Sequence, residues 1–131
     1  MPEIAFRVRD AKPRPSNETK VIRAWREAVA EAARRASGQG AFTKPTASSR
    51  FALSLRFRMT ESAPGQKSDL DNLAKPVLDT LFLPDDKQAR EPGVSGVLFD
   101  IDDSQVFWLE LEKTHVSSEE EEGVDVRVVW E

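Results

Sequence analysis

Residues 51–59 alternate along the chain between large apolar side chains and small or polar ones. Because successive side chains of a β-strand point to opposite faces of a sheet, this run predicts a strand with one buried and one open face. The buried set is Phe51, Leu53, Leu55, Phe57 and Met59, and the open set is Ala52, Ser54, Arg56 and Arg58. This is the clearest strand in the chain, and it predicts a sheet with a basic outer surface.

Four further strands are predicted, one near the start of the chain and three in its last third. They lie near residues 4–9, 97–101, 104–113 and 124–130. The acidic run Glu119–Glu122 fits a turn between the last two strands, and its charge should keep it away from a phosphate backbone.

Two helices are predicted between the strands. The first is capped by Ser16 or Asn17 and runs to about Ala36, with apolar residues at three- and four-residue spacing. The second spans about 70–82 and contains Pro76, which removes one helical hydrogen bond and predicts a kink or a distorted first turn. Because strands and helices mix irregularly, the fold class is α+β, a single small domain over residues 1–131 with a mixed β-sheet and two main helices.

Composition excludes several classes of protein. The 131 residues are 39% hydrophobic and include no cysteine and one histidine, so a disulfide scaffold, a thiolate zinc site, a cysteine nucleophile and a histidine-rich metal site are excluded. No apolar run approaches the roughly 20 residues of a membrane span, and the N-terminus lacks the apolar core of a signal peptide. We therefore expect a cytoplasmic protein without a membrane partner.

Charge is distributed unevenly between the two halves of the chain. Residues 1–60 hold 13 Lys and Arg against 5 Asp and Glu, whereas residues 61–131 hold 6 against 18. This division is compatible with a phosphate-binding surface beside a cation-binding site, and equally with unevenly scattered surface charge.

The densest group of reactive side chains lies at the start of the second predicted helix. Asp69 and Asp71 can converge only if Asp69 lies outside the helix and Asp71 lies in its first turn. A purely structural interpretation makes Asp69 a helix cap and pairs Asp71 with Lys75 on the helix surface.

A second acidic pair, Asp102-Asp103, precedes a predicted strand. Its structural interpretation is a turn that begins the strand. If that turn packs near the helix start, the carboxylates repel one another unless a cation lies between them. Ligands that are all oxygen favour Mg²⁺ or Mn²⁺, and a magnesium site beside basic strands suits phosphodiester hydrolysis.

Two linked motifs resemble the RusA-type Holliday junction resolvases, which are small, dimeric, Mg²⁺-dependent endodeoxyribonucleases. The motifs are Asp69-Leu-Asp-Asn-Leu-Ala-Lys-Pro-Val-Leu-Asp-Thr-Leu81 and Asp102-Asp-Ser-Gln-Val106, followed by a strand ending near Lys113. The resemblance implies that Asp69, Asp71 and Asp103 bind the metal and that Lys75 is the catalytic lysine. It makes Asp102 a ligand or a supporting group. Asn72 and Asp79 fit the motif, and we expect structural roles for them. Asp85-Asp86 is a competing acidic pair, but only Asp102-Asp103 is followed by the family's Ser-Gln-Val.

The resemblance also implies that basic residues contact DNA phosphates. The predicted DNA-binding residues are Arg7, Arg9, Lys12, Arg14, Arg56, Arg58 and Lys67. The expected function is that of a homodimeric, Mg²⁺-dependent nuclease that resolves four-way junctions. Two alternatives remain, a non-catalytic protein that binds branched DNA and a metal-dependent hydrolase of another phosphate ester.

Overall fold

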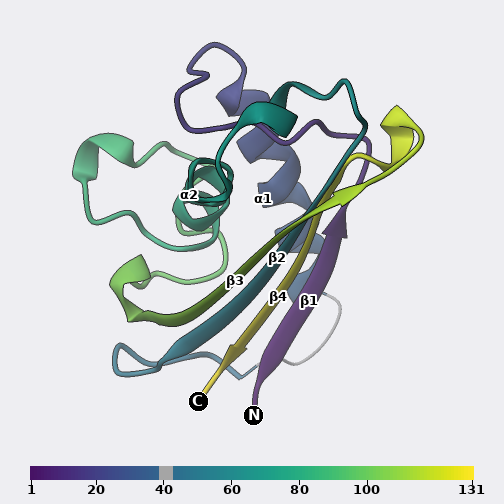
Figure 1. Ribbon diagram of the computed structural model, residues 1–131. Coiled ribbons are helices and arrows are strands. Elements are labelled where there is room, and N and C mark those ends of the chain that lie inside the picture. Colours follow the sequence, from purple (N-terminus) through teal and green to yellow (C-terminus); the bar gives the residue numbers. More distant parts are fainter. Residues whose placement is uncertain (39–42) are drawn as a thin grey trace.

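The computed structural model describes residues 1–38 and 43–131, which form one mixed four-stranded sheet and two helices (Figure 1). The strands are β1 (Glu3–Val8), β2 (Phe51–Met59), β3 (Val106–His115) and β4 (Gly123–Trp130), in the order β1-β4-β2-β3. β4 runs antiparallel to both of its neighbours, whereas β2 and β3 are parallel. The predicted α+β class and mixed sheet are confirmed.

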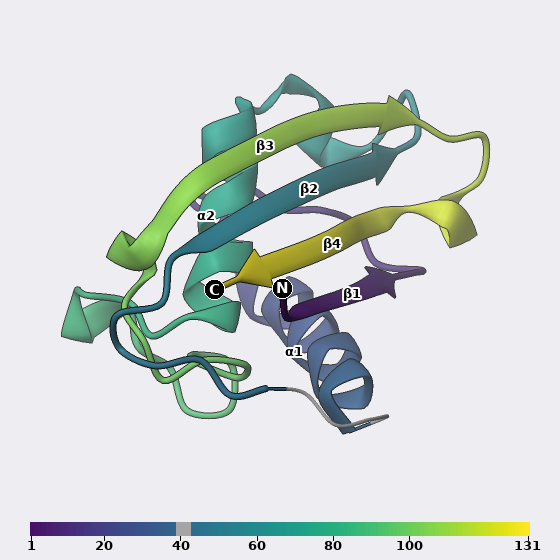
Figure 2. The same cartoon turned by 90° about the horizontal axis from the view of Figure 1, so that it is seen from below.

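Both helices, α1 (Ile22–Gly38) and α2 (Leu70–Leu81), lie on one face of the sheet (Figure 2). The apolar side chains predicted for β2 point into this interface, where Phe51, Leu53, Leu55, Phe57 and Met59 are buried. On α1, Trp25, Val29 and Ala33 are buried at the expected helical spacing. The opposite face of the sheet is open to solvent, so the fold presents two chemically different surfaces.

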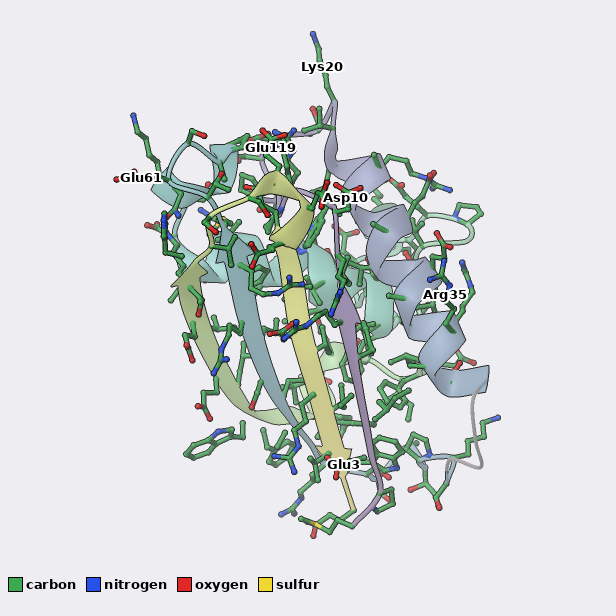
Figure 3. The ribbon with its side chains drawn as sticks, turned by 90° about the vertical axis from the view of Figure 1, so that its right-hand side faces the viewer. Glu3, Asp10, Lys20, Arg35, Glu61 and Glu119 are labelled. Atoms are coloured by element: carbon green, nitrogen blue, oxygen red, sulfur yellow. The ribbon has the colours of Figure 1, made fainter. Side chains whose placement is uncertain are left out.

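The acidic run Glu119–Glu122 lies in the connection between β3 and β4, as predicted (Figure 3). Residues Glu119–Glu121 form a short 3-10 turn, and Glu122 is fully buried. Its carboxylate accepts hydrogen bonds from Lys12 Nζ (2.7 Å) and from the main-chain N–H (3.1 Å) and hydroxyl (3.0 Å) of Thr60. This run is therefore partly structural, because one of its charges fastens the segment that follows β1.

The prediction of a strand over residues 97–101 was wrong. The main-chain N–H groups of Val97, Leu98 and Phe99 donate to carbonyls of Thr80 and Leu81 at the end of α2. The last four carbonyls of a helix have no partner within the helix, and this segment supplies partners for two residues there. Its apolar residues thus cover a helix end instead of joining the sheet.

The first helix begins later than predicted, at Ile22 instead of after Ser16 or Asn17. The preceding residues form turns, and the N–H of Ser16 donates to the carbonyl of Asn72 on α2 at 3.0 Å. Pro76 cannot donate to that carbonyl, which lies four residues before it. The connection between β1 and α1 therefore uses the acceptor that the proline leaves free, and α2 continues through Pro76 without interruption.

Candidate active site

The two acidic side chains at the start of α2 have no hydrogen-bond or ion-pair partner among the described residues. Asp69 precedes the first helical residue with an extended backbone (φ −67°, ψ 149°), but its side chain makes no capping hydrogen bond. Asp71 lies in the first turn, and both residues are exposed. In the part of the chain that the structure describes, neither carboxylate forms a hydrogen bond or an ion pair. Asp69 therefore occupies the N-cap position without a side-chain cap, and the expected pair of Asp71 with Lys75 is not formed.

Lys75 pairs with Asp79 instead of Asp71. Its Nζ lies 3.6 Å from Asp79 Oδ2, one helical turn further along α2. Asp79 is 7% exposed, and its other oxygen, Oδ1, is buried without a hydrogen-bond partner. Burial raises the pKa of Asp79, and the positive charges of Lys75 and Arg26 oppose that shift. Asp79 thus places a buried negative charge beneath the ammonium of Lys75.

Asp102 and Asp103 lie at the entry to β3, where they have different surroundings. Asp102 accepts a hydrogen bond from the Ser104 N–H at 2.6 Å, which holds its pKa below the ordinary value. This bond is the turn expected from the structural interpretation. Burial raises the pKa of Asp103, and the charges of Asp102 and Asp79 raise it further, while Lys75 lowers it. Asp103 is thus a half-buried carboxylate facing other carboxylates.

Asp103 lies close enough to Lys75 and Asp79 of α2 for their charges to shift its pKa. Asp71, Lys75 and Asp79 share one helix face because they are spaced four residues apart. Asp69 lies just before this row, about 9 Å along the helix axis from Lys75 at 1.5 Å per residue. Among residues 1–38 and 43–131, no three acidic or histidine side chains already form a group that could hold an ion. The predicted carboxylates thus line one side of α2 without meeting at a point.

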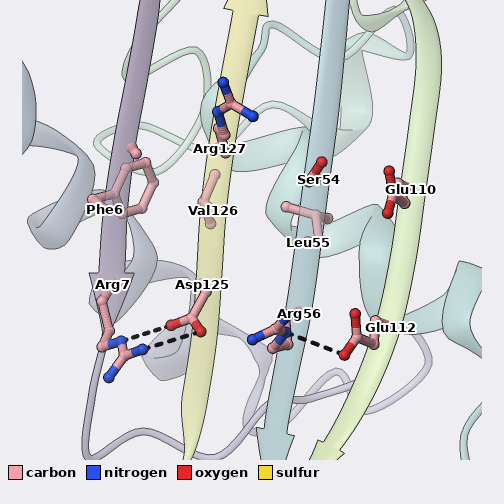
Figure 4. A pocket seen from close by; sticks show the side chains of 11 residues that line it. Phe6, Arg7, Ser54, Leu55, Arg56, Glu110, Glu112, Asp125, Val126 and Arg127 are labelled. Atoms are coloured by element: carbon pink, nitrogen blue, oxygen red, sulfur yellow. Dashed lines mark hydrogen bonds and ion pairs between the residues drawn. The ribbon is translucent and has the colours of Figure 1, made fainter.

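The basic side chains predicted on β1 and β2 lie on the open face of the sheet, away from α2 (Figure 4). Arg7 Nε lies 2.8 Å from Asp125 Oδ1, and Arg56 Nε lies 3.2 Å from Glu112 Oε1. Arg58 is 6% exposed, contacts Asp125 at 3.1 Å and donates to the carbonyls of Val8 and Glu121. Acidic side chains thus neutralise much of this basic face.

The remaining predicted DNA contacts lie in three places. Lys12 binds Glu122 and Glu119, at 2.7 and 3.2 Å, and Arg14 binds Glu18 at 3.1 Å. Arg9 is exposed beside the turn that contains Glu120 and Glu121. Lys67 is exposed in a 3-10 turn two residues before Asp69. Of the seven predicted DNA-binding residues, Lys67 is therefore the one that the chain places next to the acidic row.

Two residues of this region make contacts at the candidate site that the sequence did not indicate. Asp79 was expected to be structural, yet it pairs with Lys75 and raises the pKa of Asp103. Arg26, on α1, donates to the carbonyl of Asp79 at 3.0 Å and is 6% exposed. The spacing of four residues between Lys75 and Asp79 was an available signal for the first. Only the packing of α1 against α2 reveals the second.

Replacing Asp103 by asparagine should make the protein more stable at neutral pH. A carboxyl group with a raised pKa in the folded state costs stability as the pH rises from its ordinary value, 3.8, through the folded value. Asp103→Asn removes that cost, so its melting temperature should exceed that of the wild type by about 1–4 °C at pH 7. The difference should shrink as the pH falls to 3.8.

Thermal unfolding followed by circular dichroism at pH 7 and at pH 3.5 measures both effects. Asp100→Asn is the control, because Asp100 is exposed and lies just outside the acidic pair. A melting temperature for Asp103→Asn below that of the wild type at pH 7 would contradict the electrostatic cost assigned to Asp103.

A comparison with protein-family models found a match over most of the chain. The family model for endodeoxyribonuclease RusA matches residues 6–129, which include the second half of β1, all of β2 and β3, nearly all of β4, both helices and both acidic motifs. A search of the curated proteins found no match. No helix in the described residues is long and apolar enough to cross a membrane. With nearly its whole length matched, the chain belongs to the RusA endodeoxyribonuclease family.

Proposed function

We propose that this protein is a divalent-metal-dependent nuclease that resolves four-way DNA junctions by a symmetric pair of cuts, in recombination and repair. One observation carries the proposal. Asp69 and Asp71 stand exposed at the start of α2 with no hydrogen bond or ion pair in the described part of the chain. Carboxylates that contribute no contact to the fold are available to bind something else.

The side chains of the acidic row fit a hard divalent cation. Asp69, Asp71 and Asp103 would bind Mg²⁺ or Mn²⁺ through oxygen, and Asp102 would be a further ligand or a supporting group. Two observations support the fit, namely the raised pKa of Asp103 and the buried, unpartnered Oδ1 of Asp79. Burial and the neighbouring carboxylates both disfavour the charged form of Asp103, and a bound cation would favour it. Such an ion, when bound, lowers the pKa of water and polarises phosphoryl oxygens.

Lys75 would act on the phosphate. Its side chain is 61% exposed, so the ammonium can reach a DNA strand lying along α2. Asp79 pairs with the ammonium at 3.6 Å, which keeps the positive charge on the acidic side of the helix. The ammonium would stabilise the additional negative charge that develops on the phosphate during cleavage.

The proposed assembly is a homodimer of single endonuclease domains, each comprising residues 1–131. Two symmetric cuts need two active sites related by a two-fold axis, which a dimer supplies. Lys67 would hold the phosphate next to the cleaved one, and Arg7, Arg9, Lys12, Arg14 and Arg56 would contact outer phosphates. Arg58 was predicted to join them, but it is buried and donates to main-chain carbonyls, so it is not available to DNA. We expect the protein in the cytoplasm, associated with the nucleoid when it acts on DNA.

The shape of the surface favours a large substrate over a small phosphate ester. A hollow of about 610 Å³ lies on the open face of the sheet, lined by residues such as Arg7, Arg56 and Glu112. None of the acidic residues of α2 lines it. Asp69, Asp71 and Lys75 are instead exposed at the start and middle of α2, where a DNA strand can approach them.

Cleavage of a labelled four-way junction and of a matched linear duplex tests the proposal. With Mg²⁺ or Mn²⁺, the junction should receive paired nicks at symmetric positions, the duplex should remain intact, and EDTA should stop the reaction. Binding to both DNAs should be measured in parallel by gel shift. Tight junction binding with no cleavage under either metal would support the non-catalytic alternative. Hydrolysis of a small phosphate ester in place of the junction would support the other.

A further inference from the structure

β3 carries a lysine on the face of the sheet that the helices cover. In the register with β2, Leu109 and Leu111 lie opposite Leu53 and Leu55, and Lys113 lies opposite Phe57. Leu53, Leu55 and Phe57 are buried beneath the helices, and Leu111 packs against the same core. On this edge strand Leu109 is 41% exposed and Lys113 is half-buried. Alternation predicts an apolar residue at position 113, so the charge there needs a partner within the protein.

The partner is the main chain immediately before the acidic row. Lys113 Nζ donates to the carbonyl of Gln66 at 2.8 Å and to the carbonyl of Ser68 at 2.6 Å. Lys67 and Asp69 directly follow these two residues. Hydrogen bonds from a charged donor are stronger than those between neutral groups. The ammonium of Lys113 therefore fastens the two peptide groups that lead into Asp69.

Neutral contacts hold the earlier part of the same turn. A Cβ atom on Gly65 would lie 2.9 Å from the carbonyl oxygen of Pro13, so the turn packs closely against the segment after β1. Gln66 Nε2 donates to the carbonyl of Thr60 at 3.0 Å. Ser68 and Asp69 are both extended, with ψ of 149°. The bond from Lys113 to Ser68 is thus the contact nearest to Asp69 that ties this extended pair to the sheet.

We propose that Lys113 is a positioning residue for the nuclease reaction, holding the backbone before α2 so that Asp69 and Asp71 keep a fixed place relative to Asp103. Asp103 and Lys113 flank the same strand, at its start and near its end. β3 therefore fixes both ends of the acidic row, one through its own carboxylate and the other through a lysine. Lys113 itself touches no substrate. The proposal rests on the proposed metal-dependent function, because its effect is on the placement of metal ligands.

The variant Lys113→Met removes the charged hydrogen-bond donor while the side chain at this position still fills its place in the packing. Methionine fills a similar volume with an apolar side chain on the covered face of the sheet, whereas the carbonyls of Gln66 and Ser68 lose their donor. Groups that orient metal ligands typically contribute about 10–100-fold to metal affinity or activity. We expect Lys113→Met to weaken Mn²⁺ binding, measured by isothermal titration calorimetry, by that factor. The Mg²⁺ concentration for half-maximal junction cleavage should rise in parallel, with junction affinity unchanged in the absence of metal.

Two variants complete the experiment. Lys113→Arg keeps a charged donor and should bind Mn²⁺ more tightly than Lys113→Met if positioning is the cause. Lys20→Met is the matched control, because Lys20 is exposed and points into solvent (Figure 3). It should match the wild type in every measurement. Circular dichroism at the assay temperature verifies that each variant is folded.

The outcomes distinguish this proposal from the function on which it rests. If the wild type cuts junctions and folded Lys113→Met has the same Mn²⁺ affinity and Mg²⁺ requirement, the role of Lys113 is overturned and the nuclease function stands. If the wild type binds Mn²⁺ in a Lys113-dependent way without cutting junctions, the positioning role stands and the junction substrate is wrong. A wild type that binds no Mn²⁺ would overturn both.

Discussion

Asp71→Asn should abolish metal-dependent junction cleavage while leaving junction binding intact. The substitution removes one charge from the start of α2 but preserves side-chain size, and no structural contact of Asp71 is lost within the described residues. Removing one electrostatic group from a catalytic site typically lowers the rate by about 10²–10³-fold, and loss of a metal ligand should reach at least that range. Single-turnover cleavage with saturating protein measures the rate, and a gel shift in EDTA measures binding.

The control for Asp71→Asn is Glu61→Gln, which makes the same charge change at an exposed side chain of the turn before α2 (Figure 3). It should cut at the wild-type rate. Mg²⁺ should raise the melting temperature of the wild type more than that of Asp71→Asn, because an ion bound to the folded state stabilises it. A rate for Asp71→Asn within threefold of the wild type would remove Asp71 from the site.

Arg26→Ala should destabilise the protein more than any surface substitution. The guanidinium is 6% exposed and donates to Thr80 Oγ1 at 3.0 Å, Val94 O at 2.7 Å and Ser95 Oγ at 2.8 Å, as well as to Asp79 O. Its removal leaves several buried acceptors without a donor and leaves the Asp79 carboxylate with one nearby positive charge, that of Lys75, instead of two. Breaking a buried charged network of this kind costs about 3–5 kcal/mol.

Urea denaturation monitored by tryptophan fluorescence gives the free energy of unfolding for this comparison. Arg35→Ala, at an exposed position of the same helix, loses only a surface pair with Glu31 and should change stability by less than about 0.5 kcal/mol. A loss below 1 kcal/mol for Arg26→Ala would show that water replaces the guanidinium, and that the two helices are not joined through it.

The sequence alone was sufficient to predict those elements in which the spacing of apolar side chains specifies the buried face. The alternation over β2 and the helical spacing of α2 each specify a buried face, and the structure places those faces in the core. The prediction of a strand near residue 97 was wrong because apolar side chains indicate burial but not which element they pack against. The N–H groups of this segment satisfy the end of α2, a contact that no local pattern records.

Charged partners were the least predictable feature of the candidate site. Arg7 pairs with Asp125, which is 118 residues away, because β1 and β4 are neighbours in the sheet. Lys113 likewise bonds to carbonyls 45 and 47 residues earlier. A sequence shows where charges lie along the chain but not which charges face one another. The basic residues of β1 and β2 were therefore predicted to be free, whereas the fold places acidic side chains of neighbouring strands beside them. Asp69 and Asp71 were the converse case, since their expected structural contacts are not formed.

The position of β4 has a consequence for how the chain folds during synthesis. β4, residues 123–130, lies between β1 and β2, so β1 has no strand to pair with until those residues leave the ribosome. The segment after β1 waits as well, since Asp10 and Ala11 bond to carbonyls of Glu120 and Glu122. Sheets closed by such distant pairings form slowly and late. A nascent chain can therefore expose its acidic helix before the framework that fixes it exists, and a DNA-cutting activity would arise only with the completed sheet.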